Sequence, residues 1–92
     1  MAQVVVTLRI MPSSVDVDLS LIEGNVKQEI VNFCNSKEFR ATIIPVAFGL
    51  KALQMIFVME ESKGSTEDLE NKISKLEGIE SVEVTDVRRA IG

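Results

Sequence analysis

The sequence contains no histidine, no tryptophan and no tyrosine, and its only cysteine is Cys34. Histidine-based acid–base catalysis is therefore excluded, and histidine is the side chain that normally titrates near neutral pH. A lone cysteine forms no internal disulfide, and without histidine the chain lacks the ligands of an ordinary tetrahedral zinc site. We expect a cytoplasmic protein with no metal or other cofactor, in which Cys34 has a structural role.

Long hydrophobic runs are also missing. No apolar segment approaches the roughly 20 residues that cross a bilayer. Thr7 and Arg9 interrupt the apolar N-terminal stretch, which lacks the pattern of a signal peptide. The net charge of −4 and the pI of about 4.8 disfavour binding to nucleic acid, which requires a concentrated positive surface. We therefore expect neither a membrane nor a nucleic-acid partner.

The composition is that of a globular protein, with 46% hydrophobic and 26% charged residues. A length of 92 residues predicts a single domain, residues 1–92. A domain of this size buries little more than ~60% of the surface of its unfolded chain, so it has one modest core. With four phenylalanines as the only aromatic residues, that core must be mainly aliphatic.

Hydrophobic periodicity predicts four strands separated by two helices. Pro45 places the second strand at a sheet edge, because proline lacks the N–H that a ladder requires. Asp18 is the expected N-cap of a first helix that ends near Cys34, and Ser65 is the expected N-cap of a second helix that Gly78 ends. The predicted strands are Gln3–Met11, Arg40–Val46, Lys51–Glu60 and Ile79–Arg88.

The order of elements is therefore β-α-β-β-α-β. Two helices on one face of a four-stranded antiparallel sheet make a two-layer α+β sandwich, the ferredoxin-like arrangement. Right-handed crossovers in both halves place the first and third strands at the centre of the sheet.

Signatures of chemistry that this fold can carry are missing from the sequence. The Pro12–Val17 loop has no Cys-x-x-Cys pair, and the open face of the central strands lacks the paired aromatics on which RNA bases stack. Cys34 has no histidine to activate it as a nucleophile. Acidic pairs such as Asp16 and Asp18 adjoin helix starts, where negative charge is favoured. We expect no covalent catalysis.

Two segments stand out from this structural background. In the connection around Phe48, the phenylalanine either folds back over the core or protrudes as an apolar anchor of the kind that dominates protein interfaces. Gly49 permits a tight turn beside it. The C-terminal tail has a basic pair, Arg88 and Arg89, and is either a plain terminus or a reaching arm.

The stretch Phe48-Gly49-Leu50-Lys51-x-Leu53-Gln54 resembles the FG-I/L-K-x-L-Q motif of the elongation factor 1-beta exchange domain, and the similarity covers essentially the whole chain. The stand-alone archaeal form is the most similar. Further matching positions are Pro12, Leu19, Val26, Lys27, the strand from Ile56 to Glu61, and Asp86.

This resemblance implies a guanine nucleotide exchange factor that promotes release of GDP and reloading of GTP on the GTPase elongation factor 1-alpha. It also implies a monomer when the factor is free. The family's apolar contact before a proline falls on Ile43 or Ile44, while Phe48, Gly49 and Lys51 match the family's motif directly.

The C-terminal end departs from the family's pattern. Eukaryotic members place a lysine next to the last residue, where it is thought to enter the magnesium site of the GTPase, but here Ile91 occupies that place. The nearest cations are Arg88 and Arg89. Either an arginine replaces the lysine, or this chain acts mainly by displacing the switch region of its partner.

A second interpretation belongs to another functional class. A small-molecule-binding regulatory domain of the same ferredoxin-like fold would act as a dimer. It predicts a stable homodimer whose melting temperature shifts with ligand, whereas the exchange factor is expected to be a free monomer.

Overall fold

The order of strands and helices agrees with the prediction from the sequence. A computed structural model describes residues 2–36 and 38–90. A single 3₁₀ turn, η1 (Glu61–Lys63), follows the third strand. The other elements are β1 (Gln3–Pro12), α1 (Leu19–Cys34), β2 (Phe39–Pro45), β3 (Lys51–Glu60), α2 (Glu67–Ser74) and β4 (Ile79–Arg89).

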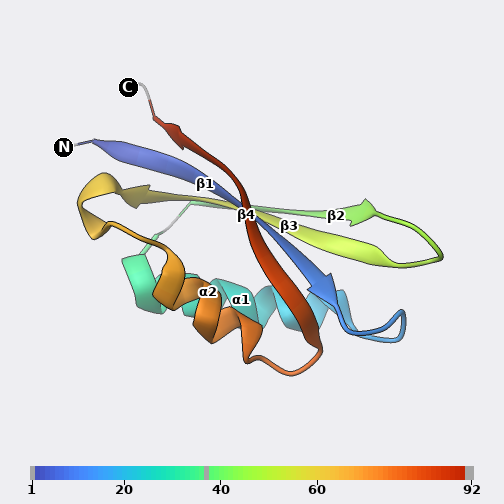
Figure 1. Ribbon diagram of the computed structural model, residues 1–92. Helices are drawn as coiled ribbons and strands as arrows, with labels where there is room; N and C mark the ends of the chain where they lie inside the picture. The colour runs from blue at the N-terminus through green and yellow to red at the C-terminus, as the bar shows by residue number, and fades with distance from the viewer. Residues whose placement is uncertain (1, 37, 91–92) are drawn as a thin grey trace.

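The four strands form one antiparallel sheet in the order β2-β3-β1-β4, so the first and third strands are central, as predicted. Both helices lie on the same face of this sheet and leave the other face open (Figure 1). Pro45 ends β2, which is an edge strand, in agreement with the missing N–H of proline. The fold is the expected two-layer ferredoxin-like sandwich.

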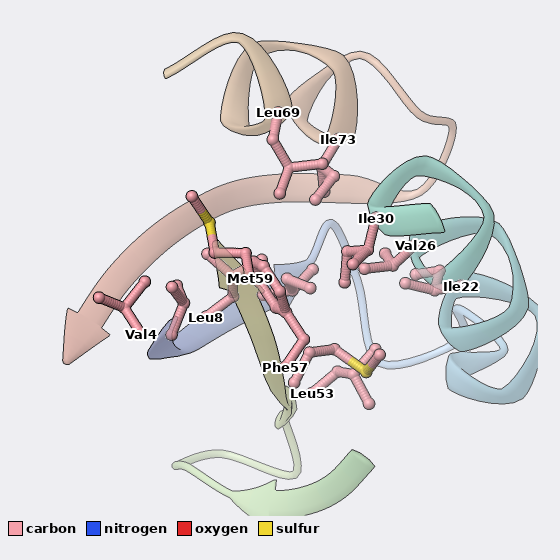
Figure 2. Packing of buried hydrophobic residues seen from close by; sticks show 13 residues of the cluster. Val4, Leu8, Ile22, Val26, Ile30, Leu53, Phe57, Met59, Leu69 and Ile73 are labelled. Carbon is pink, nitrogen blue, oxygen red and sulfur yellow. The ribbon is translucent and has the colours of Figure 1, made fainter. Parts of the chain in front are cut away.

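The core lies between the sheet and the two helices (Figure 2). Alternate residues of β1 and β3 point into it, and Phe57 at its centre has no exposed surface. The helical stripe of α1 buries Ile22, Val26 and Ile30 against the same layer, while α2 contributes Leu69 and Ile73. Each such side chain stabilises the fold by about 1.5–3 kcal/mol relative to exposure.

The start of α1 confirms the predicted cap. The backbone N–H of Ser20 donates to Oδ1 of Asp18 at 2.9 Å, which satisfies one of the free donors of the first turn. Asn35 ends the helix in the left-handed conformation, with φ 54°. Within the described residues, none of the helices is both long enough and apolar enough to span a bilayer.

The predicted ends of the second helix were wrong. The N-cap position of α2 is Thr66, whose hydroxyl donates to Oε2 of Glu70 at 2.8 Å, while Ser65 accepts the N–H of Glu67 one position earlier. Ser65 therefore makes the side-chain bond to the first turn, whereas Thr66 occupies the N-cap position without a side-chain bond to the backbone amides.

Gly78 also differs from its predicted role as a helix end, because α2 stops at Ser74. It instead forms the turn into β4, with φ 88°, and its carbonyl accepts the N–H of Ser13 at 2.8 Å. A Cβ atom at this position would lie 3.2 Å from Cγ1 of Val17, so the glycine permits close approach of the β1–α1 loop.

A β-bulge interrupts the pairing of β4 with β1. Val84 lies opposite Leu8 and Asp86 opposite Thr7, so Thr85 is an extra residue in the strand. Beyond the bulge, Arg88 lies opposite Val5 on the open face of the sheet. Arg89 lies opposite Val4, on the side of the helices.

Candidate partner-binding surface

The β2–β3 connection is a tight hairpin with an unusual residue at its tip. The N–H of Val46 donates to the carbonyl of Leu50 and the N–H of Leu50 donates to the carbonyl of Ala47, both at 2.9 Å. The two central residues, Phe48 and Gly49, have φ of 54° and 78°. Positive φ at both positions is typical of a type I′ turn, which normally contains Asn-Gly or Asp-Gly.

The side chain of Phe48 is 99% exposed, so it does not fold back over the core. Of the two roles left open by the sequence, the core-capping role is wrong. A non-glycine residue in the left-handed region costs about 1–2 kcal/mol. The hairpin therefore holds a large apolar ring in water on a strained backbone, and neither feature contributes to the stability of the isolated chain.

The neighbours of Phe48 in the predicted site divide between the two faces of the sheet. Ile43 lies opposite Leu53 on the helix side and is still 49% exposed, while Ile44 lies opposite Ala52 and is half-buried. Ile43, Gly49 and Lys51 line one groove of about 340 Å³, together with residues of the β1–α1 loop. Ile44 does not line this groove.

The two arginines lie at the opposite end of the sheet from the hairpin (Figure 1). Arg89 is opposite Val4, which pairs with Met59, and Met59 lies eight residues along β3 from Lys51. At about 3.4 Å per residue, this separates the arginines from the hairpin by roughly 27 Å. The predicted site residues therefore form two groups, not one cluster.

Each arginine has an acidic partner within the chain. Nε of Arg88 lies 2.9 Å from Oδ2 of Asp86. Nε and Nη2 of Arg89 donate to the two carboxylate oxygens of Glu61 at 2.9 and 3.0 Å, which ties β4 to η1. The arginine side chains are largely exposed and the two carboxylates are close to half exposed, so these pairs stabilise the fold only weakly. The remaining tail residue of interest, Ile91, lies outside the described residues.

Comparison with known proteins places this geometry in context. The sequence pattern of the EF-1 guanine nucleotide exchange domain matches residues 5–90. The chain belongs to this family. The resemblance found in the sequence and the exchange role that it implies are thus confirmed.

Archaeal members of the exchange family align along nearly the whole chain. Elongation factor 1-beta of Methanobrevibacter smithii is 40% identical over 89 residues, which is 97% of this chain and 98% of that protein. Elongation factor 1-beta of Staphylothermus marinus is 39% identical over 90 residues, with the same coverage. That of Thermoplasma acidophilum is 32% identical over 87 residues, 95% of this chain and 97% of that protein.

Solved structures with the same arrangement support the fold alone. The de novo designed protein Foldit4 superposes with a TM-score of 0.63 at 20% identity and covers 98% of both chains. BlrP1 BLUF superposes with a TM-score of 0.55 at 16% identity, covering 98% of this chain and 56% of that one.

Cys34 lies far from the hairpin, at the end of the sheet that also carries the arginines, where it lines a hollow with Gln3 and Glu60. Its Sγ donates to the carbonyl of Ile30 at 3.4 Å, one turn earlier in α1. Burial raises the pKa of the thiol above its ordinary value, which outweighs the opposing effects of the Ser36 backbone and the Lys63 charge. A thiol held in its neutral form is a poor nucleophile, in agreement with a structural role.

Two exposed apolar residues were missed by reasoning from the sequence: Val15 adjoins Gly49 of the hairpin, whereas Leu21 lines a hollow with Glu77 and Gly78. Val15 lies in the β1–α1 loop and Leu21 in the first turn of α1, and they are 60% and 65% exposed. Leu21 carries a recognisable signal, because it is a large apolar residue outside the stripe that runs through Leu19, Ile22 and Val26. Val15 carries none.

Proposed function

We propose that this exchange domain promotes release of GDP from elongation factor 1-alpha and lets GTP reload it. It acts in the cytoplasm, is a monomer until it meets the GTPase, and makes no direct contact with nucleic acid. Family membership and the archaeal proteins called elongation factor 1-beta support the partner. The single observation that carries the residue-level proposal is Phe48, exposed on a strained hairpin tip within that domain.

Exchange of this kind needs no covalent chemistry. Binding of the factor and binding of GDP to the GTPase oppose each other, and each weakens the other by the same factor. Faster release by ~10³ requires a barrier lower by only ~4 kcal/mol. A few contacts that disturb the switch region or the magnesium site of the GTPase supply that amount, because Mg²⁺ neutralises the nucleotide phosphates.

The hairpin is the proposed point of engagement. The Phe48 ring enters an apolar pocket of the GTPase. Gly49 forms the tight turn and has no side chain that would obstruct the approach of the partner to this ring. Ile43 is the better candidate than Ile44 for the neighbouring apolar contact, because it shares the groove with Gly49 and Lys51. Lys51 supplies a positive charge at the base of the hairpin.

The arginines play a smaller part in this proposal. A GTPase that touches both them and Phe48 must extend along roughly 27 Å of the sheet. Each guanidinium is also already paired, so its transfer to the partner replaces one ion pair by another. Displacement of the switch region by the hairpin is therefore favoured over entry of an arginine into the magnesium site.

The direct test loads elongation factor 1-alpha with a fluorescent GDP analogue and follows its release by stopped flow. Micromolar factor is expected to accelerate release by ~10³-fold over excess unlabelled GDP alone. Sedimentation of the free factor is expected to report a monomer. An unchanged release rate contradicts the proposed function, and a stable dimer whose melting temperature shifts with a small ligand supports the regulatory-domain interpretation instead.

Alanine variants of Arg88 and Arg89 test whether the arginine end of the sheet contributes less to nucleotide exchange than the hairpin end does. Arg88→Ala and Arg89→Ala are each expected to slow exchange by less than about fivefold, since an exposed pair is worth about 1 kcal/mol or less. The melting temperature is expected to change little. A loss near 100-fold in either variant, with an intact fold, would instead place that arginine in the magnesium site.

A further inference from the structure

Three of the four arginines lie on the open face of the sheet, which the helices leave uncovered (Figure 1). Strand register places Arg9 of β1, Arg40 of β2 and Arg88 of β4 on this face. The lysines of the described residues lie on the helices, in the turns beside them or on the core-facing side of β3: Lys27, Lys51, Lys63, Lys72 and Lys75. Arginine is enriched and lysine depleted in interfaces relative to the rest of a protein surface, so this distribution marks the open face as a candidate interface.

The centre of the open face is apolar. On the two central strands Val5 lies opposite Val58 and Ile56 opposite Thr7, and the three apolar side chains are half-buried although neither helix covers them. A sheet face in water normally carries polar residues at such positions. Charged residues at paired positions on this face lie around the centre: Arg9, Arg40, Glu60, Glu83, Asp86 and Arg88. An apolar centre within a charged rim is the usual anatomy of a protein interface.

Two of the arginines on this face are available to a partner. Arg88 is already paired with Asp86. Arg9 lies opposite Glu83, yet neither Arg9 nor Arg40 forms an ion pair with any residue that the structure describes, and both are exposed. A guanidinium group binds a carboxylate through two parallel hydrogen bonds. The open face therefore suits a partner surface that carries carboxylates around an apolar centre.

The open face is also large enough to hold a partner, and it reaches the hairpin. Alternate residues of β2, from Arg40 through Ile44, point to this face and end at the base of the Phe48 turn. Four strands about 4.8 Å apart and a length of roughly 27 Å give the face an area of ~500 Å². With the Phe48 ring, which buries about 150–250 Å², the surface approaches the ~800 Å² that each side of a stable interface buries. The hairpin tip alone falls far short of that area.

We propose that the open face of the sheet is the docking surface for elongation factor 1-alpha, and that Arg9 and Arg40 bind carboxylates of the GTPase there. This inference rests on the proposed function of the hairpin. The occupant is the GTPase because the face lies between the Phe48 hairpin and the arginine end of the sheet, so a partner that spans these two groups of candidate contact residues must cover it. Docking on the face supplies affinity, and the hairpin acts on the bound GTPase.

The test compares charge-matched variants in the nucleotide-release assay over a range of factor concentrations. Arg9→Gln with Arg40→Gln removes two charges from the open face and keeps polar side chains. The factor concentration that gives half-maximal acceleration is expected to rise about tenfold, with the release rate at saturation unchanged. This difference from wild type is expected to shrink as ionic strength rises, because salt screens exposed charges. Lys72→Gln with Lys75→Gln removes the same charge on the helix side and is expected to stay within about twofold of wild type.

The outcomes separate this inference from the proposed function. Wild type that accelerates release, with the arginine double variant unaffected, overturns the docking surface alone, and wild type that does not accelerate release overturns both. Equal shifts in the arginine and lysine double variants indicate an effect of total charge and overturn the docking surface. A wild-type dimer that the arginine variant dissociates, with exchange unchanged, assigns the face to a second copy instead. A tenfold shift in the arginine variant alone, with an unchanged melting temperature, supports the inference.

Discussion

Replacement of Phe48 by asparagine is expected to make the protein more stable and far less active. Asparagine is favoured at positive φ and, followed by Gly49, makes the usual type I′ pair. The gain in the free energy of unfolding is expected to be about 1 kcal/mol, which urea denaturation measures. Loss of a central anchor of at least about 2 kcal/mol corresponds to a fall in exchange rate of roughly 30-fold.

Phe48→Tyr is the matched control for this prediction. It keeps an aromatic ring at the same backbone conformation, so both the stability and most of the exchange activity are expected to remain. If Phe48→Asn unfolds at lower urea concentration than wild type, the turn is not strained as described. If it exchanges nucleotide normally, Phe48 is not the anchor.

Phe57→Ala is expected to have the largest effect on stability. Phe57 is fully buried in the core between the sheet and the helices, and loss of such a ring costs about 3–5 kcal/mol. A chain of this length has a total stability of roughly 5–14 kcal/mol. Thermal denaturation monitored by circular dichroism should therefore show a melting temperature lower by tens of degrees, or an unfolded protein at room temperature.

Phe33→Ala separates the effect of burial from that of ring loss. Phe33 is only partly buried at the edge of the core, where the ammonium of Lys63 lies 5.5 Å from its ring centroid. Its replacement is expected to cost clearly less than that of Phe57. Equal losses in the two variants would contradict the description of the core as centred on β3.

The order of elements and the core could be predicted because each rests on local periodicity. In β3 every second residue is buried, as the alternation in the sequence predicts: Leu53, Met55, Phe57 and Met59. Asp18 caps α1 by accepting the N–H of Ser20, only two residues further along the chain. The start of α2 was predicted one residue too early because Ser65 and Thr66 are chemically similar neighbours: Ser65 accepts the N–H of Glu67, but Thr66 occupies the N-cap position.

The candidate site could be predicted only in part. The motif marked the hairpin residues, and Gly49 indicated the turn, but the exposure of Phe48 depends on the length of the hairpin beyond the helices. The contact between position 49 and Val15 joins residues far apart in the chain, which no local pattern reports. The separation of Arg88 from the hairpin likewise follows from strand pairing and not from sequence distance.

The extra residue in β4 also determines what the C-terminal tail presents. Side chains of a strand alternate, and the bulge at Thr85 shifts every later residue of β4 by one position against β1, so the bulge selects which of the two adjacent guanidinium groups points away from the helices. Without the bulge, Thr85 would pair with Thr7 and every later residue would shift by one position, so Arg88 would lie opposite Val4 on the side of the helices and Arg89 opposite Gln3 on the uncovered side. A relative with the same tail residues but no bulge would thus offer a different cation to the same partner.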